Sequence, residues 1–170
     1  MAGGATTADG LYAWSCRPEE TVLTENTPSA DFLIRPAEEE DEAATVALWR
    51  ACGLVASYND PHADFRFARA GAASDVLIAI NGDGRIVGSV MVGHDGHRGW
   101  LYYVAADPGA RSRGIGREMV RAAEAWLREK GVRKTQLLVR RSNAGVVAFY
   151  EHLGFEESTV VVMQRWLDGT

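Results

Sequence analysis

Cysteine is scarce in this sequence, with only Cys16 and Cys52 among 170 residues. Two isolated cysteines provide neither a disulfide framework nor the spacing of a metal site, which excludes the small proteins that such links hold together. Because reducing compartments disfavour disulfides, the sequence favours a cytoplasmic location, and we expect no bound metal.

Long apolar runs are also missing. No stretch approaches the roughly 18 apolar residues that a membrane-spanning helix requires, so no membrane association is expected. The first ten residues, MAGGATTADG, lack the basic start and apolar stretch of a signal peptide. The sequence has no excess of positive charge either, since its formal net charge is -5. Nucleic acid is therefore not expected as a partner, because its binding depends on phosphate neutralisation.

What remains is the composition of an ordinary soluble domain, with 46% hydrophobic and 24% charged residues. Residues 1–30 are rich in Ala, Gly, Thr and Glu and show no sustained period. We interpret them as a flexible or loosely docked N-terminal extension. Residues 31–170 have the length of one domain with a single core.

The first half of this domain alternates helical and strand-like patterns. Acidic residues followed by apolar residues at helical spacing indicate a helix, and Asn81-Gly82-Asp83-Gly84 between two β-rich runs is a hairpin signal. The expected elements are a strand over 32–35, a helix over 38–53, a weaker helix over 63–70, and antiparallel strands over 76–80, 85–92 and 100–105.

The second half continues in the same style. Its most periodic stretch is a helix over 114–130, which stops at Gly131. A buried-type strand over 136–139, a short helix over 143–152 and a final strand over 160–167 follow. This order predicts one α/β domain of the α+β type, with a mixed, mostly antiparallel sheet flanked by helices.

A short stretch, RSRGIG at residues 111–116, stands where the 114–130 helix begins. A helix N-terminus binds anions through its unpaired N–H groups, glycines allow close approach, and arginines add charge. The stretch is not a Walker loop, which needs GxxxxGK[ST], nor a Rossmann fingerprint, because Met119 occupies the third glycine position. Alone, it is equally compatible with a solvated loop.

A second motif, NAGVVAFYEHLGF at residues 143–155, changes that balance. The two motifs in this order resemble the GNAT N-acetyltransferase superfamily, and the resemblance extends over roughly residues 32–167. It implies that the chain transfers acetyl from acetyl-coenzyme A to an amine on a small molecule or a protein, without a metal. The stretches SYNDP and VGHDGHRGWLYYV look more closely like its YpeA-like branch.

The resemblance also assigns residues to the cofactor. The backbone around Arg111, Ser112, Arg113, Gly114, Ile115 and Gly116 would hold the coenzyme A pyrophosphate, although Ser112 replaces a common glycine. The main chain of Val104, Ala105 and Ala106 would pair with the pantetheine arm, as in strand augmentation, and the sheet should splay there. Asn143 would bind the pantetheine, or else Ser142 or Asn143 simply caps the following helix.

Tyr150 is the expected catalytic acid, because a phenol can donate a proton to the departing thiolate. The alternative is a core aromatic. The general base is less well defined: Asp60 in the loop between the first two helices is one candidate, and Asp95 or His97 in the turn HDGH is another. That turn lacks the further ligands of a metal site.

A different class of function stays open, namely a non-catalytic module that binds or senses acyl-coenzyme A. Such a protein would keep the pyrophosphate loop and lose the acid, the base or the acceptor pocket. A homodimer is a further expectation, because the final strand would be exposed.

Overall fold

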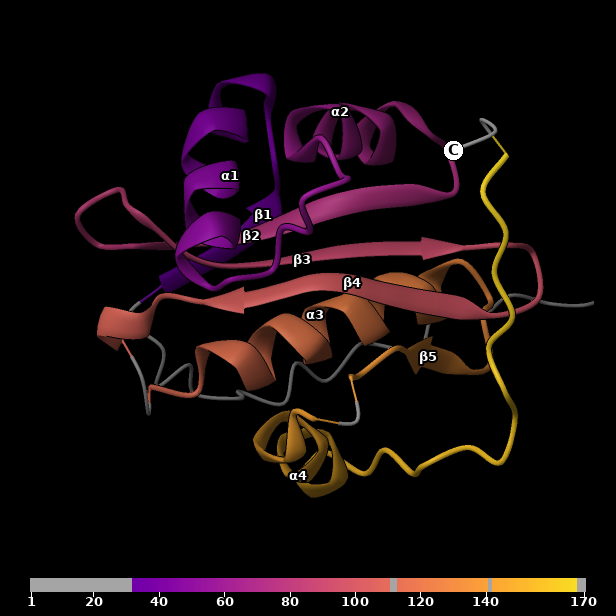
Figure 1. The fold of residues 1–170 in the computed structure, drawn as a ribbon. Helices are drawn as coiled ribbons and strands as arrows, with labels where there is room; N and C mark the ends of the chain where they lie inside the picture. Colours follow the sequence, from indigo (N-terminus) through magenta and orange to yellow (C-terminus); the bar gives the residue numbers. More distant parts are fainter. Residues whose placement is uncertain (1–31, 111–112, 141, 168–170) are drawn as a thin grey trace, which may run out of the picture.

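The computed structural model describes residues 32–110, 113–140 and 142–167. The predicted extension over residues 1–30 lies outside this part of the chain. In chain order the elements are β1 (Phe32–Pro36), η1 (Glu39–Asp41), α1 (Glu42–Ala51), α2 (Pro61–Ala70), β2 (Ser74–Asn81), β3 (Ile86–His94), β4 (Gly99–Ala106), η2 (Pro108–Ala110), α3 (Ile115–Glu129), β5 (Thr135–Leu137) and α4 (Ala144–His152) (Figure 1).

The sheet has five strands in the order β1-β2-β3-β4-β5. The first four are antiparallel to their neighbours, and β5 runs parallel to β4. Gly84 closes the β2–β3 hairpin with a φ of 77°, a left-handed conformation that glycine adopts without strain. The predicted mixed, mostly antiparallel sheet is confirmed.

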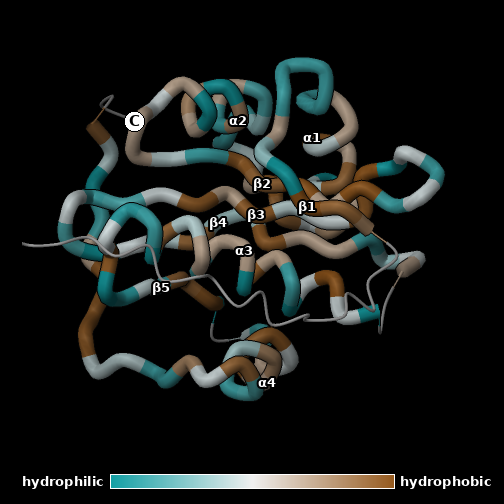
Figure 2. The backbone as a smooth tube through the Cα atoms, turned by 180° about the vertical axis from the view of Figure 1, so that it is seen from behind, coloured by the Kyte–Doolittle hydropathy of each residue, from teal (hydrophilic) through white to brown (hydrophobic). Residues whose placement is uncertain are grey.

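Helices cover both faces of this sheet. Figure 1 shows α1 and α2 on one face and α3 on the other, with α4 beyond α3. Two buried clusters result, one around Trp49 and Phe65 and one around Met119 and Leu127. Figure 2 shows hydrophobic strand segments running through the middle of the molecule. None of the helices in the described ranges is long and apolar enough to cross a bilayer.

Helix α3 lies very close to the sheet because two strand residues lack side chains. A Cβ atom on Gly88 would lie 2.5 Å from Ile115, and one on Gly99 would lie 2.5 Å from Leu127. Both glycines therefore permit an approach that any larger residue would block. This contact fixes the N-terminus of α3 beside the end of β4.

Most predicted elements are present with small boundary shifts. The helix expected from residue 38 begins with a short 3-10 turn, and α2 begins at Pro61, two residues earlier than expected. Proline is favoured there because the first helical N–H needs no partner. The 136–139 strand is shorter than predicted and ends at Leu137.

The predicted final strand over 160–167 is wrong. This segment is extended chain without strand pairing, and its apolar side chains are exposed: Val161 by 81%, Met163 by 88% and Leu167 by 95%. A run of β-branched residues forms a strand only when a neighbour accepts its backbone hydrogen bonds. No strand of the described sheet pairs with it, and it passes across the end of the sheet instead.

Candidate active site

Strand β4 contains a bulge at Tyr103. At this point one β3 residue, Val90, faces two β4 residues, Tyr103 and Val104. Tyr103 has a φ of 48°, a left-handed conformation that is uncommon for a non-glycine residue. A bulge interrupts the ladder and changes the direction of the neighbouring side chains, as bulges beside active sites do.

Beyond the bulge, β4 parts from β5. The two strands pair only over Gly99–Leu101 and Thr135–Leu137, whereas β4 continues to Ala106. Val104, Ala105 and Ala106 therefore have no strand beside them on the β5 side within the described chain. The predicted cofactor stretch thus lies where β4 has no described pairing strand on its β5 side.

Buried hydrogen bonds on the α1 side of the sheet support the bulge. Trp49 Nε1 donates to Ser89 Oγ at 2.8 Å, and Ser89 Oγ donates to the Tyr103 carbonyl at 3.3 Å. The Trp49 and Tyr103 rings are stacked with centroids 4.1 Å apart. Trp49 and Ser89 are both fully buried. These contacts stabilise an unusual backbone conformation that would otherwise be costly.

The Tyr103 side chain connects the bulge to helix α2. Its hydroxyl donates to Asp64 Oδ2 at 2.7 Å and accepts from Asn59 Nδ2 at 3.4 Å. Burial, followed by the hydrogen bond and charge of Asp64, raises the pKa of Tyr103, while Asn59 acts in the opposite direction. Sequence reasoning missed both Asp64 and Tyr103. The available signal was the helical spacing that sets Asp64 one turn after Asp60.

Asp60 itself has a structural role at the start of α2. Its Oδ1 accepts backbone hydrogen bonds from His62 at 2.9 Å and Ala63 at 3.3 Å, which makes it the N-cap. These bonds lower the pKa of the exposed carboxyl. A carboxylate stabilised in this way is a weaker base than a free one.

Helix α3 begins beside the open edge of β4. Arg111 and Ser112 lie outside the described residues, and Arg113 is exposed. Gly114 occupies the N-cap with a φ of 75° and no capping side chain, and no atom lies within 4 Å of the place where its Cβ would be. The N-cap therefore supplies no side-chain acceptor for the first-turn N–H groups of α3, and such unpaired groups are what an anion site uses.

Gly116 has a packing role in addition to the one predicted. A Cβ atom there would lie 3.3 Å from Phe149, so the glycine lets α4 approach α3.

Tyr150 is buried, with only 9% of its surface exposed. Its ring makes edge-on contacts with the rings of Phe149 and Phe155, with ring centroids 5.0 and 5.4 Å away. Burial raises the pKa of Tyr150 to about 12, so its phenol stays protonated near neutral pH.

Asn143 stands at the N-cap of α4, where the sequence left two roles open. It is exposed, and its side chain makes no capping hydrogen bond. Capping by the Asn143 side chain is therefore not seen among the described residues, and the cofactor role of Asn143 stays a prediction.

The turn between β3 and β4 is held by Asp95. Its carboxylate accepts from the backbone N–H groups of Arg98 at 2.6 Å and His97 at 2.8 Å, and from Trp100 Nε1 at 3.1 Å. These bonds, led by the one from Arg98, lower the pKa of Asp95 to about 2. Asp95 thus closes the turn and is a poor base. The described part of the chain contains no group of three metal-ligating side chains.

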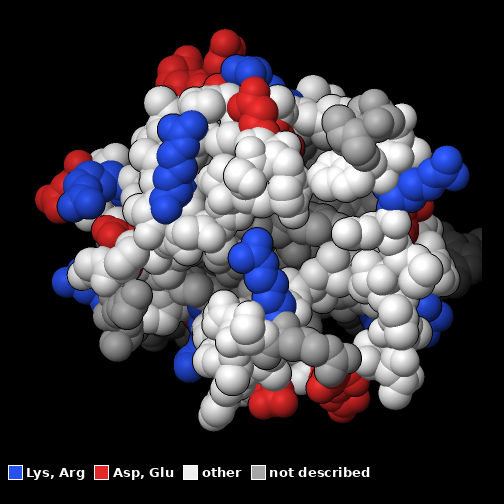
Figure 3. All heavy atoms as spheres, viewed as in Figure 1, with Lys and Arg blue, Asp and Glu red and all other residues white. Residues whose placement is uncertain are grey.

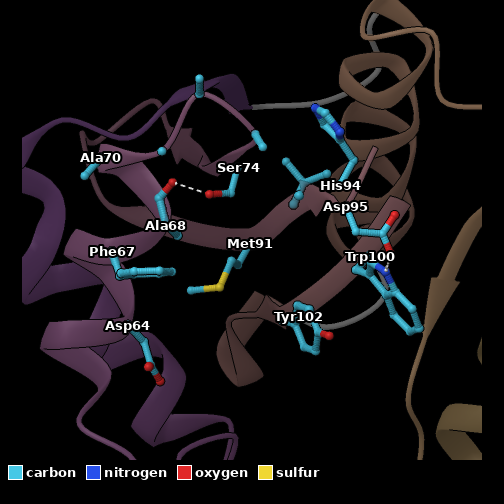
Figure 4. Close-up of a pocket in the computed structure, with 15 residues that line it drawn as sticks. Asp64, Phe67, Ala68, Ala70, Ser74, Met91, His94, Asp95, Trp100 and Tyr102 are labelled. Atoms are coloured by element: carbon cyan, nitrogen blue, oxygen red, sulfur yellow. Dashed lines mark hydrogen bonds between the residues drawn. The ribbon is translucent and has the colours of Figure 1, made fainter. Parts of the chain in front are cut away.

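An open pocket of about 690 Å³ lies on the α1 and α2 face of the sheet, next to the bulge. Figure 3, in the view of Figure 1, shows a molecular surface with hollows near its centre and with acidic and basic side chains interspersed. Figure 4 shows Asp64 at one end of the pocket, His94 and Asp95 at the other, and Met91 between them.

The β4 edge without a described partner, its bulge and the start of α3 are compatible with the class of enzyme that the two sequence motifs suggest, an acetyltransferase. The chain belongs to the Acetyltransferase (GNAT) family, whose sequence profile matches residues 28–155. Members of this family use acetyl-coenzyme A as the acetyl donor.

Individual proteins agree with this assignment. The chain is 35% identical over 134 residues to an acetyltransferase of Pectobacterium atrosepticum, a match that covers 79% of this chain and 94% of that one. Its fold is similar to AAC(6')-Iy in complex with the bisubstrate analogue CoA-S-monomethyl-acetylneamine (TM-score 0.68, 21% identity, 79% and 97% of the two chains). It is also similar to glucosamine-6-phosphate N-acetyltransferase from Arabidopsis thaliana (TM-score 0.64, 21% identity, 81% and 99%).

Proposed function

We propose that this acetyltransferase moves the acetyl group of acetyl-coenzyme A onto an amine by direct attack in a ternary complex. The observation that carries the proposal is the bulge at Tyr103 beside the open edge of β4. This arrangement sets free main-chain groups next to a tyrosine, a carboxylate and a pocket. A thioester lying along the edge would meet an amine entering from the pocket.

The residues on this edge fit the cofactor. Val104–Ala106 would pair with the pantetheine arm, Asn143 would bond to it, and the start of α3 from Gly114 would receive the pyrophosphate. Arg111 and Ser112 join this set on the sequence resemblance alone. The bound cofactor supplies an acetyl group activated as a thioester, and an N–H at or next to Val104 would stabilise the developing oxyanion.

Asp64 is the base that the geometry favours. The attacking nitrogen must be neutral, whereas a free amine near pH 7 is mostly protonated. Asp64 is half-buried and held by the Tyr103 hydroxyl beside the bulge. It would accept the proton as the nitrogen forms its bond to the acetyl carbon and the carbon–sulfur bond breaks.

Tyr150 would act on the departing thiolate. Its pKa of about 12 is well above the roughly 8.5 of a thiol, so complete proton transfer to sulfur is uphill. We therefore assign Tyr150 the role of a hydrogen-bond donor that stabilises the thiolate, which then takes its proton from solvent. This is a more specific role than the general acid expected from the sequence.

An amine as acceptor, of whatever kind, is supported by the family and by the names of two structural neighbours, which include acetylneamine and glucosamine-6-phosphate. The proposal also assigns the chain to a YpeA-like branch of the family, because of the SYNDP and VGHDGHRGWLYYV stretches.

A cytoplasmic location and a homodimer are further parts of the proposal. The dimer would form through the exposed 160–167 segment. Light scattering on the full chain and on a chain ending at residue 157 tests the dimer.

A thiol-release assay tests the reaction. Acetyl-coenzyme A is mixed with the protein and a panel of primary amines, and free thiol is measured against a control without amine. Amine-dependent thiol release and an acetylated amine in the mass spectrum support the proposal. Cofactor binding by calorimetry without turnover of any amine would instead support the non-catalytic sensing module.

A further inference from the structure

The pocket beside the bulge has a distinctive lining. It is formed by the second half of α2, the loop after it, the end of β3 and the start of β4. Most of its lining residues are apolar or aromatic, and the larger ones are Phe67, Met91, Val92, Trp100 and Tyr102. Its volume of about 690 Å³ is in the range of small-molecule sites, which run from about 300 to 1,000 Å³.

Aromatic rings remain uncovered in this pocket. Phe67 is 84% exposed on α2, and Tyr102 is 45% exposed on β4. The ring of Tyr102 is nearly parallel to that of Trp100, with centroids 6.5 Å apart. Figure 4 shows the Met91 side chain between Phe67 and Tyr102. Exposed apolar surface gathered in a concavity is characteristic of a binding site whose ligand covers it.

The pocket is lined by two carboxylates and one imidazole, that of His94. Asp64 lies at the end next to the bulge, Asp95 lies at the far end, and none of the described lining residues is Lys or Arg. Asp95 accepts from three donors of its own turn, whereas within the described chain the Asp64 carboxylate accepts from Tyr103 alone. An ammonium group would therefore be attracted to Asp64, and a phosphorylated acceptor would be repelled.

We propose that this pocket selects acceptors whose amine is carried on an apolar, preferably aromatic, body, with the amine at Asp64 and the body against Phe67, Met91 and Tyr102. The inference rests on the proposed function and adds the acceptor class to it. An amino sugar is disfavoured because its hydroxyl groups would lose water and find few partners among these side chains.

The test compares three amines by thiol release: 2-phenylethylamine, 1,5-diaminopentane and glucosamine. The expected kcat/KM for 2-phenylethylamine is at least tenfold above both others. Phe67→Ser should lower that preference at least fivefold, because it removes one aromatic wall. Phe67 is exposed, so folding should survive, and acetyl-coenzyme A affinity should not change. Leu33→Ser is the matched control, since Leu33 is 66% exposed on β1 and does not line the pocket.

A preference for the diamine or the amino sugar, or a Phe67→Ser effect that is equal for all three amines, would overturn the inference. If no amine is turned over, the proposed reaction is wrong, and the pocket assignment is then tested by binding alone. In that case calorimetry with 2-phenylethylamine and coenzyme A still measures binding. Binding that weakens in Phe67→Ser but not in Leu33→Ser keeps the pocket assignment, and absence of binding removes it.

Discussion

The Tyr103 hydroxyl donates to Asp64 Oδ2 at 2.7 Å and so ties the β4 bulge to helix α2. The contact holds the Asp64 carboxylate against the side chain of Tyr103, which lies two residues after the last β4 residue that pairs with β5. Two carboxylates on one helix, Asp64 and the N-cap Asp60, can therefore be compared directly for the role of base.

We expect Asp64→Asn to lower kcat by about 10²-fold or more, because the amide can still accept from Tyr103 but cannot take a proton. Acetyl-coenzyme A affinity should stay the same. Asp60→Asn provides the comparison, since asparagine also caps a helix. Steady-state kinetics and calorimetry measure both variants. If Asp60→Asn loses turnover and Asp64→Asn does not, the two assignments must be exchanged.

Asp60→Ala should reduce stability without changing the chemistry. The substitution leaves the N–H groups of His62 and Ala63 without their acceptor. We expect Tm to fall by about 2–4 °C, as for the loss of one helix cap in a domain of this size. Asp60→Asn should keep the parental Tm in the same thermal scan. Equal losses in both variants would mean that the cap does not stabilise α2.

Gly114→Asp should weaken acetyl-coenzyme A binding at least tenfold, about 1.4 kcal/mol, because it adds negative charge at the start of α3. Gly131→Asp is a closely matched control at the other end of this helix. The two glycines have φ values of 75° and 74°. At both positions, apart from the neighbouring residues in the chain, no atom lies within 4 Å of the place that a Cβ atom would occupy. Both variants should therefore carry similar backbone strain. Calorimetry showing equal affinity for the two would contradict the anion site.

Tyr150→Phe should lower kcat by about 10²-fold to 10³-fold, because it removes the hydrogen-bond donor to the thiolate and keeps the ring. The loss should shrink with acetyl donors whose thiol leaves more easily. Cofactor affinity and Tm at neutral pH should change little. A variant with parental turnover would leave Tyr150 as a core aromatic.

Tyr150 also predicts a pH effect on stability. Its pKa rises from 10.0 to about 12 on folding, so its stabilising contribution is complete below pH 10 and is lost as pH rises towards 12. Over that window the parent should lose stability more steeply than Tyr150→Phe. Urea unfolding at pH 9.5 and 11.5 measures the difference. Parallel loss in both proteins would show that Tyr150 is not responsible.

Some features of this protein follow from the sequence alone. Periodic apolar residues and glycine stops were sufficient for α3 and for the β2–β3 hairpin, because local spacing fixes which face is buried. The RSRGIG and NAGVVAFYEHLGF motifs indicated the family, since they join glycines, arginines and a tyrosine at characteristic positions. Asp60 was found as a functional candidate, but only the backbone N–H groups of His62 and Ala63 show that it caps α2.

Only the tertiary structure decided how the site is assembled. The bulge at Tyr103 depends on Val90 across the sheet and on Trp49 beneath it, which are distant in sequence. The contact between Asp64 and Tyr103 spans two elements, so no local pattern reveals it. The 160–167 segment shows the opposite limit. Its valines favour a strand by propensity, but a strand needs a neighbouring strand to pair with its backbone. Whether such a neighbour is present is decided only by the tertiary structure, and here the segment has none within the described sheet.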